Sequence, residues 1–219
     1  GDPPLSAAHY VPEGSKGASD AGRALIAHHI ARQSAANAHQ QGAKPMSAEM
    51  SAAPAAIDAA LSRDAIRQLV CGYSRGVDRG DKELLTSIFW ADSTVISGVV
   101  NASGPEFASG IVDYVTANLD YCFHSVANEW IEINGDHGVG EHYIVAHMCA
   151  GGQDVMTGGR YIDSYERRGD VWKIASRTFV ADWNTSHPKS LELDGMYESL
   201  KTRGSFGKGD PVYALWGSL

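Results

Sequence analysis

Two side chains of this 219-residue chain, Asp78 and His124, have the types needed for proton-transfer chemistry. Asp78 lies just before an Arg-Gly-Asp sequence that predicts a tight corner between two helices, and His124 lies in a segment with strand character. An imidazole is a moderate base near neutral pH. A carboxylate bonded to one ring nitrogen fixes the tautomer and stabilises the imidazolium. If the two side chains meet in a closed, mostly apolar pocket, they can move a proton of a bound substrate.

Both residues also have purely structural interpretations. Asp78 could cap the second helix, or pair with Arg75 or Arg79 in the same helix. His124 could be a core histidine whose ring nitrogens are satisfied by hydrogen bonds. Spacing alone does not separate these interpretations from the catalytic one.

The elements that must position Asp78 are two helices. Apolar residues recur at helical spacing up to the corner, at Ile66, Leu69, Val70, Tyr73 and Val77. Gly80 ends this helix and Asp81 caps the next, whose apolar stripe is expected to run to Phe89 before Trp90 breaks it. Residues 94–99 predict a first strand, and residues 107–119 a third helix.

The elements that must position His124 are strands. Residues 122–133, 137–150, 155–168 and 171–184 have strand character and are separated by turns of Gly with Asn, Asp or Gln. This pattern predicts an antiparallel meander, and helices followed by a meander predict the α+β class. A curved sheet of this kind leaves a concave face, and helices that close that face make a cone with a cavity inside.

The chain divides into three predicted parts. Residues 1–56 predict an extended or partly helical N-terminal arm, in which residues 21–41 favour a helix; an unordered segment, or sequence foreign to the natural protein ahead of Met46, is the alternative. Residues 57–187 form the α+β cone. Residues 188–219 form a Gly- and Pro-containing tail that packs on the domain or on a neighbouring subunit.

Composition excludes several classes of function. The net charge of −8 offers no basic surface for nucleic acid. No run of 18 apolar residues predicts a transmembrane helix, and the first residues do not look like an intact signal peptide, so a cytoplasmic location is expected. The cysteines number three, without a CxxC pair, and are interpreted as reduced and buried. His142 and His147 fall on opposite faces of one strand and cannot share a metal, so no metal site is predicted.

Further residues carry a family resemblance. The string Gly-Val-Asp-Arg-Gly-Asp before a short helix ending in Phe-Trp resembles the SnoaL-like family of the superfamily named for nuclear transport factor 2. His124 four residues before Asn128, ahead of an Asn-Gly-Asp turn, agrees with it. So does Tyr-Glu-Arg-Arg before Val-Trp-Lys on the last hairpin. The resemblance covers about residues 58–184.

The resemblance implies cofactor-free lyase chemistry like that of lindane dehydrochlorinase, scytalone dehydratase and bile acid 7α-dehydratase. Matching the dehydrochlorinase pattern residue by residue places its catalytic Asp and His at Asp78 and His124, with Arg177 and Tyr161 in its pocket. Scytalone dehydratase has a second catalytic His, which matches His142. The chain therefore combines both patterns, which leaves the leaving group open.

These residues predict a reaction and its partners. His124 is the base, Asp78 orients it, and His142 or Tyr161 delivers a proton to the departing group, while Arg177 holds a leaving group or an oxyanion. Aromatic residues expected near the substrate are Tyr73, Trp90 and Trp183. The substrate would be a small hydrophobic, aromatic or alicyclic compound that loses water, a hydrogen halide or formaldehyde, for instance a lignin-derived diarylpropane. An isomerase with the same base and a non-catalytic binding module are the alternatives. No cofactor and no membrane partner are expected. The chain is expected to form a homo-oligomer, a trimer or a dimer, through the outer face of the sheet.

Overall fold

The computed structural model describes residues 46–189 and 195–216, with side chains from residue 54 onward. The chain divides into two compact units, residues 1–54 and 55–219, and every predicted site residue lies in the second. The helix predicted within residues 21–41 lies outside the described residues. Within them, no helix has the length and apolar character needed to cross a bilayer.

Two helices and a tight corner carry Asp78. Helix α2 (Met46–Arg79) buries one apolar stripe, formed by Ile66, Val70, Tyr73 and Val77. Gly80 follows it with φ of 63°, a conformation that glycine adopts without steric cost. Asp81 then caps α3 (Lys82–Ser87) by accepting a hydrogen bond from the Leu84 N–H at 3.0 Å. The predicted corner is confirmed.

The prediction that Phe89 belongs to the second helix and Trp90 breaks it is wrong. Phe89 opens strand β1 (Phe89–Ile96), which also replaces the strand predicted over residues 94–99, and β2 (Asn101–Ser103) follows. The Ile174 N–H donates to the Ile88 carbonyl at 2.9 Å. Pairing with the sheet therefore ends the helix at Ser87 instead of Phe89, because packing overrides local propensity.

The remaining elements complete one six-stranded sheet. After α4 (Gly104–Asn118) come β3 (Tyr121–Asn134), β4 (His137–Ala150), β5 (Gln153–Arg168) and β6 (Val171–Pro188). The strand order is β2-β1-β6-β5-β4-β3. The four long strands form the predicted antiparallel meander, whereas β1 joins β6 in parallel. The α+β prediction is confirmed, although the curved sheet remains open at β2 and β3 instead of closing into a barrel.

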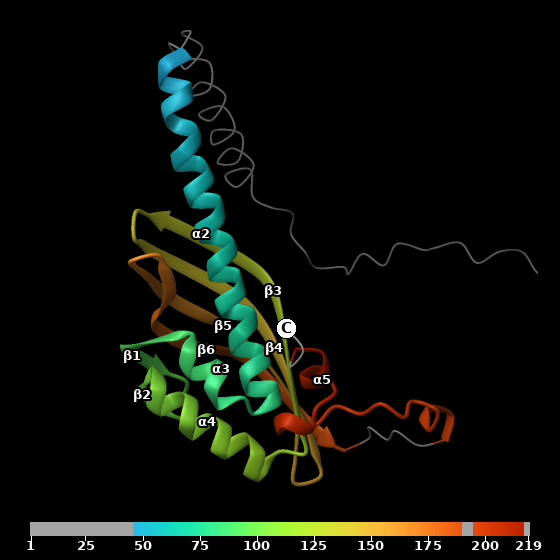
Figure 1. Ribbon diagram of the computed structural model, residues 1–219. Coiled ribbons are helices and arrows are strands. Elements are labelled where there is room, and N and C mark those ends of the chain that lie inside the picture. The colour runs from blue at the N-terminus through green and yellow to red at the C-terminus, as the bar shows by residue number, and fades with distance from the viewer. Residues whose placement is uncertain (1–45, 190–194, 217–219) are drawn as a thin grey trace, which may run out of the picture. The chain divides into compact units, whose positions relative to one another are not determined.

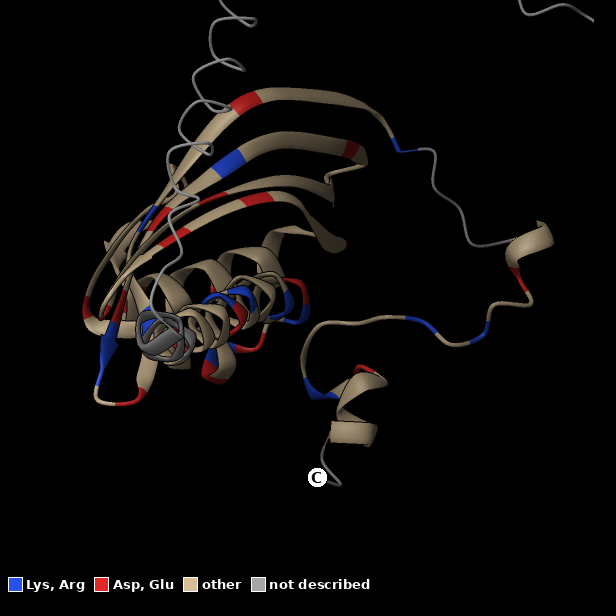
Figure 2. Cartoon of the chain, turned by 90° about the horizontal axis from the view of Figure 1, so that it is seen from above, with Lys and Arg blue, Asp and Glu red and all other residues tan. Residues whose placement is uncertain are grey.

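The helices lie against one face of this curved sheet (Figures 1 and 2). Side chains alternate between the two faces of each strand. In β4 the buried set includes His142, Ile144 and Ala146, and it meets the stripe of α2 and the buried face of α4 in one core. This concave side of the sheet is where the candidate site residues converge.

The described part of the tail packs on the corner that follows Asp78. It contains two short 3-10 helices, η1 (Gly195–Tyr197) and η2 (Gly207–Gly209), and helix α5 (Val212–Trp216). The Tyr213 hydroxyl donates to Asp81 at 2.6 Å, and Arg79 lies 3.4 Å from Asp210. These contacts are made within one chain, and the predicted choice between the chain's own domain and a neighbouring subunit stays a prediction.

Candidate active site

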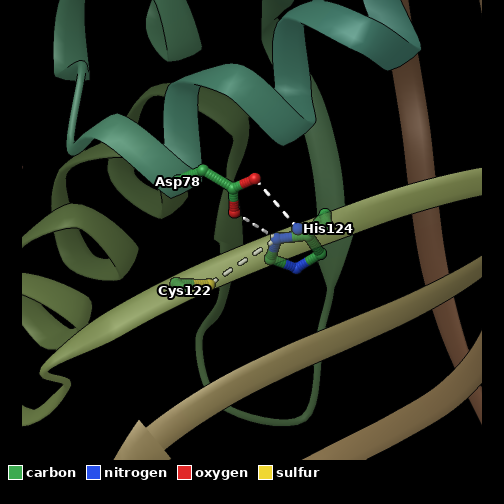
Figure 3. A group of neighbouring side chains, drawn as sticks. All are labelled: Asp78, Cys122 and His124. Atoms are coloured by element: carbon green, nitrogen blue, oxygen red, sulfur yellow. Dashed lines mark hydrogen bonds and ion pairs between the residues drawn. The ribbon is translucent and has the colours of Figure 1, made fainter. Parts of the chain in front are cut away.

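Asp78 and His124 are in contact. Asp78 sits in the last turn of α2, and its Oδ1 lies 2.6 Å from Nδ1 of His124 on β3 (Figure 3). The backbone N–H of His124 also donates to Asp78 Oδ2 at 2.9 Å. A carboxylate in the last turn of a helix opposes the helix dipole. The two hydrogen bonds from β3 offset that cost and hold both carboxylate oxygens.

The hydrogen bond sets the protonation pattern of the imidazole. An ionised carboxylate only accepts hydrogen bonds. Nδ1 of His124 therefore carries a hydrogen and donates the hydrogen bond to Asp78. The neutral ring then has its lone pair on Nε2. That nitrogen lies on the side of the ring away from Asp78 (Figure 3). The pair is therefore arranged as an oriented base.

Cys122 adjoins the pair. Its Sγ lies 3.6 Å from Nδ1 of His124, because residues two apart on a strand share a face. Burial raises the pKa of the Cys122 thiol, and the negative charge of Asp78 raises it further. Each of Asp78, Cys122 and His124 offers a metal-ligand atom, and the three atoms lie within 4.8 Å of one another.

An apolar cavity of about 200 Å³ adjoins His124. Its wall includes His124, Cys122, Tyr73 and Tyr161. Most of the rest of the wall is aliphatic or aromatic, with Val77, Ile111, Val115, Ile144, Met148 and Phe179. The rings of Tyr73 and Tyr161 lie 5.1 Å apart between centroids, and the Tyr73 ring lies 6.4 Å from the imidazole. Tyr114 is also on the wall, so a bound molecule would meet an apolar surface with an imidazole and three phenols.

A second hollow of about 370 Å³ lies on the other side of the pair. Asp78 and Cys122 both line it, together with Asp120 and the tail residues 203–206. The carboxylate and the thiol thus separate an apolar cavity from a more polar hollow.

Arg177 is fully buried beside the cavity but is absent from its wall. Its guanidinium lies 4.2 Å from the centre of the Tyr73 ring and 4.1 Å from that of Tyr161. It donates two hydrogen bonds to Asp163, at 2.8 and 2.6 Å, while Nη1 has no hydrogen-bond partner among the described residues. The predicted pocket arginine is thus a buried ion pair that contacts the two pocket tyrosines.

His142 projects from the concave face, yet it does not reach the cavity wall. It is completely buried, and its Nε2 lies 2.9 Å from the hydroxyl of Tyr165, which donates to Asp163 at 2.6 Å. Burial lowers the pKa of His142, against the nearby Asp163 charge that raises it. In this geometry His142 cannot deliver a proton to a molecule in the cavity directly.

Trp90 and Trp183 lie elsewhere. The Trp90 indole donates to the Glu166 carbonyl at 3.0 Å, and Arg168 lies 4.6 Å from its ring centre. Trp183 is half exposed near the end of β6, where it covers Gly158 on β5. Of the five predicted substrate contacts, Tyr73 and Tyr161 are on the cavity wall.

Sequence reasoning missed Cys122 and Asp163. Cys122 is recognisable in retrospect, because it stands two residues before His124 and must share its face. The same period extends from His142 to the wall residues Ile144 and Ala146. Asp163 carries no such signal, since its role depends on the register that sets it opposite Arg177.

Comparison with known proteins places this geometry in a family. The model of the SnoaL-like domain matches residues 58–178. The chain is similar to the gamma-hexachlorocyclohexane dehydrochlorinase of Sphingobium indicum, at 28% identity over 134 residues, which is 59% of this chain and 86% of the relative.

Solved structures give the same result. The crystal structure of LinA has 27% identity and a TM-score of 0.55, and the alignment covers 59% of this chain and 90% of that one. The hexachlorocyclohexane dehydrochlorinase LinA-type3 of Novosphingobium barchaimii has 26% identity and a TM-score of 0.56 over 62% of this chain and 95% of that one. The match to the SnoaL-like domain leaves residues 1–57 and 179–219 outside it.

Proposed function

The chain belongs to the SnoaL-like domain family, and from that premise we propose that it is a cofactor-independent lyase. In the proposed reaction His124 removes a proton from a small hydrophobic ring compound, and a leaving group departs from the neighbouring carbon. The observation that carries the proposal is the 2.6 Å contact between Asp78 and His124 at the wall of an apolar cavity. The similarity of the chain to enzymes named as dehydrochlorinases supports the lyase class.

The base in this reaction is Nε2 of His124. It takes the proton, the electrons of the C–H bond form the new double bond, and the leaving group departs with the electrons of its own bond. Asp78 stabilises the imidazolium that results, and the low dielectric of the cavity strengthens that interaction. The base is restored when the proton on Nε2 passes to the departing group or, after the product has left, to water that enters the cavity, because only loss of that proton leaves Nδ1 protonated toward Asp78.

The departing group would be assisted by the phenol of Tyr161 or Tyr73. Both side chains are on the cavity wall and both lie against the Arg177 guanidinium. Burial raises the pKa of Tyr161, and the positive charge of Arg177 opposes that rise. Each phenol is therefore protonated at neutral pH and can donate a hydrogen bond. Arg177 acts through these rings, while His142 holds the network behind them.

The cavity size favours a substrate with one ring. Its volume of about 200 Å³ is below the roughly 300–1,000 Å³ of sites that hold drug-sized ligands. A chlorinated or hydroxylated cyclohexane or a small aromatic compound suits this volume better than a two-ring diarylpropane. Hydrogen halide is the first candidate leaving group, with water and formaldehyde as the alternatives.

The test compares His124→Gln with His147→Gln. His147 lies on the opposite face of β4, half-buried beside Tyr121 and Asp154, so its substitution controls for the loss of an imidazole. Over a panel of halogenated cyclohexanes and aromatic alcohols, we expect turnover to fall roughly 10²- to 10⁴-fold in His124→Gln and to change little in His147→Gln. Equal turnover in both variants would refute the assignment of the base.

Product analysis separates the competing functions. Release of halide, water or formaldehyde together with a new double bond identifies a lyase. A product with the mass of the substrate identifies an isomerase that uses the same base. Binding of panel compounds without any product identifies a binding module in which the pair is only structural.

We further propose that copies of the chain associate through the outer face of the sheet. Trp130, Val139 and Ile162 are 69%, 55% and 41% exposed, and they line one shallow hollow on that face. Exposed apolar side chains gathered in this way are typical of interaction surfaces. Light scattering should give the mass of a trimer or a dimer, and Trp130→Glu should reduce it to that of a single chain.

A further inference from the structure

We propose that Asp78, Cys122 and His124 form a binding site for a borderline divalent metal ion such as Zn²⁺, and that a metal bound there switches off the base. These side chains offer a carboxylate oxygen, a sulfur and an imidazole nitrogen, which are the ligand types that zinc takes in proteins. The three donor atoms lie within 4.8 Å of one another. The first half of the proposal is independent of the proposed function, whereas the second half rests on it.

The donor spacing suits a tetrahedral ion. With ordinary zinc bond lengths, a sulfur and a nitrogen on one tetrahedral ion lie about 3.5 Å apart, and Cys122 Sγ lies 3.6 Å from Nδ1 of His124. A carboxylate oxygen and a nitrogen would lie about 3.3 Å apart, against the 2.6 Å of the present hydrogen bond. The distance between Asp78 Oδ1 and Nδ1 of His124 would therefore increase by about 0.7 Å when a metal replaces the shared proton.

Two of the three ligands come from a rigid element. Cys122 and His124 point from the same face of β3. The residues of β3 that precede and follow them, Tyr121 and Ser125, are both paired with β4. The third ligand is held by the His124 N–H, which donates to Asp78 Oδ2 and leaves Oδ1 directed at the ring nitrogen. The cluster is thus held in place before any ion arrives.

An ion also has a way in. Asp78 and Cys122 line the second hollow, whose wall includes Asp120 and residues 203–206 of the tail. A hydrated ion can reach the carboxylate and the thiol from this side without crossing the apolar cavity. With three protein ligands, the ion keeps one position open for water, as in zinc sites that are not closed by a fourth side chain.

The effect on the base follows from the position of one proton. A bound metal would displace the thiol proton of Cys122 and the proton on Nδ1 of His124. The ring would take up one proton from the solvent at Nε2, so that one proton per chain is released overall. A neutral imidazole that is bound to metal through Nδ1 carries its hydrogen on Nε2. The lone pair that would take the substrate proton is then absent, so metal stops the reaction even while the apolar cavity stays open.

Binding is measured first, without any substrate. The reduced full-length chain is titrated with Co²⁺, which substitutes for Zn²⁺ and gives a charge-transfer absorption only when a thiolate is bound. We expect one Co²⁺ per chain with this absorption, and competition by Zn²⁺. In Cys122→Ser the absorption should vanish, and Zn²⁺ affinity should fall by more than the roughly 10- to 100-fold that loss of an outer-shell partner costs.

Matched controls exclude other thiols and imidazoles. Cys71→Ser removes an exposed thiol, and Cys149→Ser removes a buried thiol that donates to Asp120; both variants should keep the absorption. Histidines elsewhere, such as His28 and His29, bind the same amount of metal in the wild type and in Cys122→Ser. Their contribution therefore cancels when the two titrations are subtracted. An absorption that is missing from the wild type, or that survives in Cys122→Ser, overturns the site.

The tautomer is measured by ¹⁵N NMR of the His124 ring. Addition of Zn²⁺ should move the proton from Nδ1 to Nε2, and a chelator should reverse the change. If Co²⁺ binds through Cys122 but the proton stays on Nδ1, the proposed switch is wrong and the site stands. A metal-free protein that turns over none of the panel refutes the proposed function, and both measurements here are unaffected by that result.

Discussion

Two aspartate–histidine arrangements on the concave side of the sheet, Asp78 with His124 and Asp163 with His142, differ in the partners of the carboxylate. Asp78 bonds directly to Nδ1 of His124, and the imidazole faces a cavity. Asp163 instead accepts two hydrogen bonds from Arg177 and one from Tyr165, and His142 lies 3.9 Å away from it. The first carboxylate polarises an imidazole, whereas the second is neutralised by a guanidinium.

The difference teaches that residue types alone do not define a catalytic pair. A carboxylate that is shared with a buried guanidinium has little charge left to stabilise an imidazolium, and burial then keeps the histidine neutral. The Asp78 arrangement adjoins the apolar cavity. Asp163 and His142 are absent from the wall of that cavity, and Asp163 holds Arg177, whose guanidinium lies against the rings of Tyr73 and Tyr161.

The largest expected effect is that of Asp78→Asn on turnover. The amide keeps the shape of the carboxylate but no longer favours a proton on Nδ1 of His124, so the ring loses its oriented lone pair. We expect turnover to fall roughly 10²- to 10⁴-fold, with a cost in the free energy of unfolding of only about 1–3 kcal/mol. Steady-state kinetics and urea unfolding of the same sample measure turnover and stability. Unchanged turnover would mean that Asp78, like Asp163, has only a structural role.

Asp163→Asn should show the opposite balance. It leaves the Arg177 guanidinium buried without a counter-ion, and breaking a buried pair from one side costs about 3–5 kcal/mol. Urea unfolding followed by circular dichroism measures this loss. The double variant with Arg177→Met removes both charges, so most of the lost stability should return. A single variant as stable as the wild type would mean that this ion pair does not hold the sheet.

Much of the fold was predictable because its signals are local. The apolar stripe of α2, the Gly80-Asp81 corner and the Gly turns each determine one element from adjacent residues. The start of β1 was placed at residue 94 instead of 89 because Phe89 continues a helical stripe, and only pairing with β6, about 85 residues later, decides the matter. Contacts between distant segments are not encoded in local periodicity.

The candidate site was predictable in part for the same reason. The positions of Asp78 and His124 follow from a corner and a strand, and the family resemblance supplied their pairing. The period-2 alternation predicts that His142 and His147 lie on opposite faces of one strand, but it does not show which of the two reaches the cavity. Whether His142 reaches the cavity depends on Tyr165 and Asp163, which close over it from β5.

Tyr165→Phe tests whether the second arrangement is structural. The change removes the hydroxyl that bonds to both Asp163 and His142 and leaves one buried nitrogen without a partner. Such a loss costs about 1–3 kcal/mol. Tyr165 is not on the cavity wall. Its effect on turnover should therefore be nearly independent of the reaction, and turnover should change less than about threefold. A large fall in turnover with intact stability would instead bring this network into the reaction.

The smallest expected effect is a pH dependence that belongs to His142. The Tyr165 hydroxyl donates to Asp163, so Nε2 of His142 carries the hydrogen that Tyr165 accepts, and the ring is neutral. Burial lowers the pKa of His142 in the folded state. Below the unfolded value of about 6.5, the unfolded chain therefore binds more protons than the folded one, and the free energy of unfolding falls as the pH decreases.

His142→Gln isolates this contribution, because glutamine keeps an N–H donor near the position of Nε2 but does not titrate. Urea unfolding of both proteins between pH 5 and 8 should give parallel stabilities above about pH 6.5. Below it, the wild type should lose up to about 1.4 kcal/mol per pH unit more than the variant. The other titratable groups are common to both proteins, so their contributions cancel in the comparison. Equal slopes in the acid range would mean that His142 accepts a proton in the folded state as readily as in the unfolded chain, which a sealed arrangement does not allow.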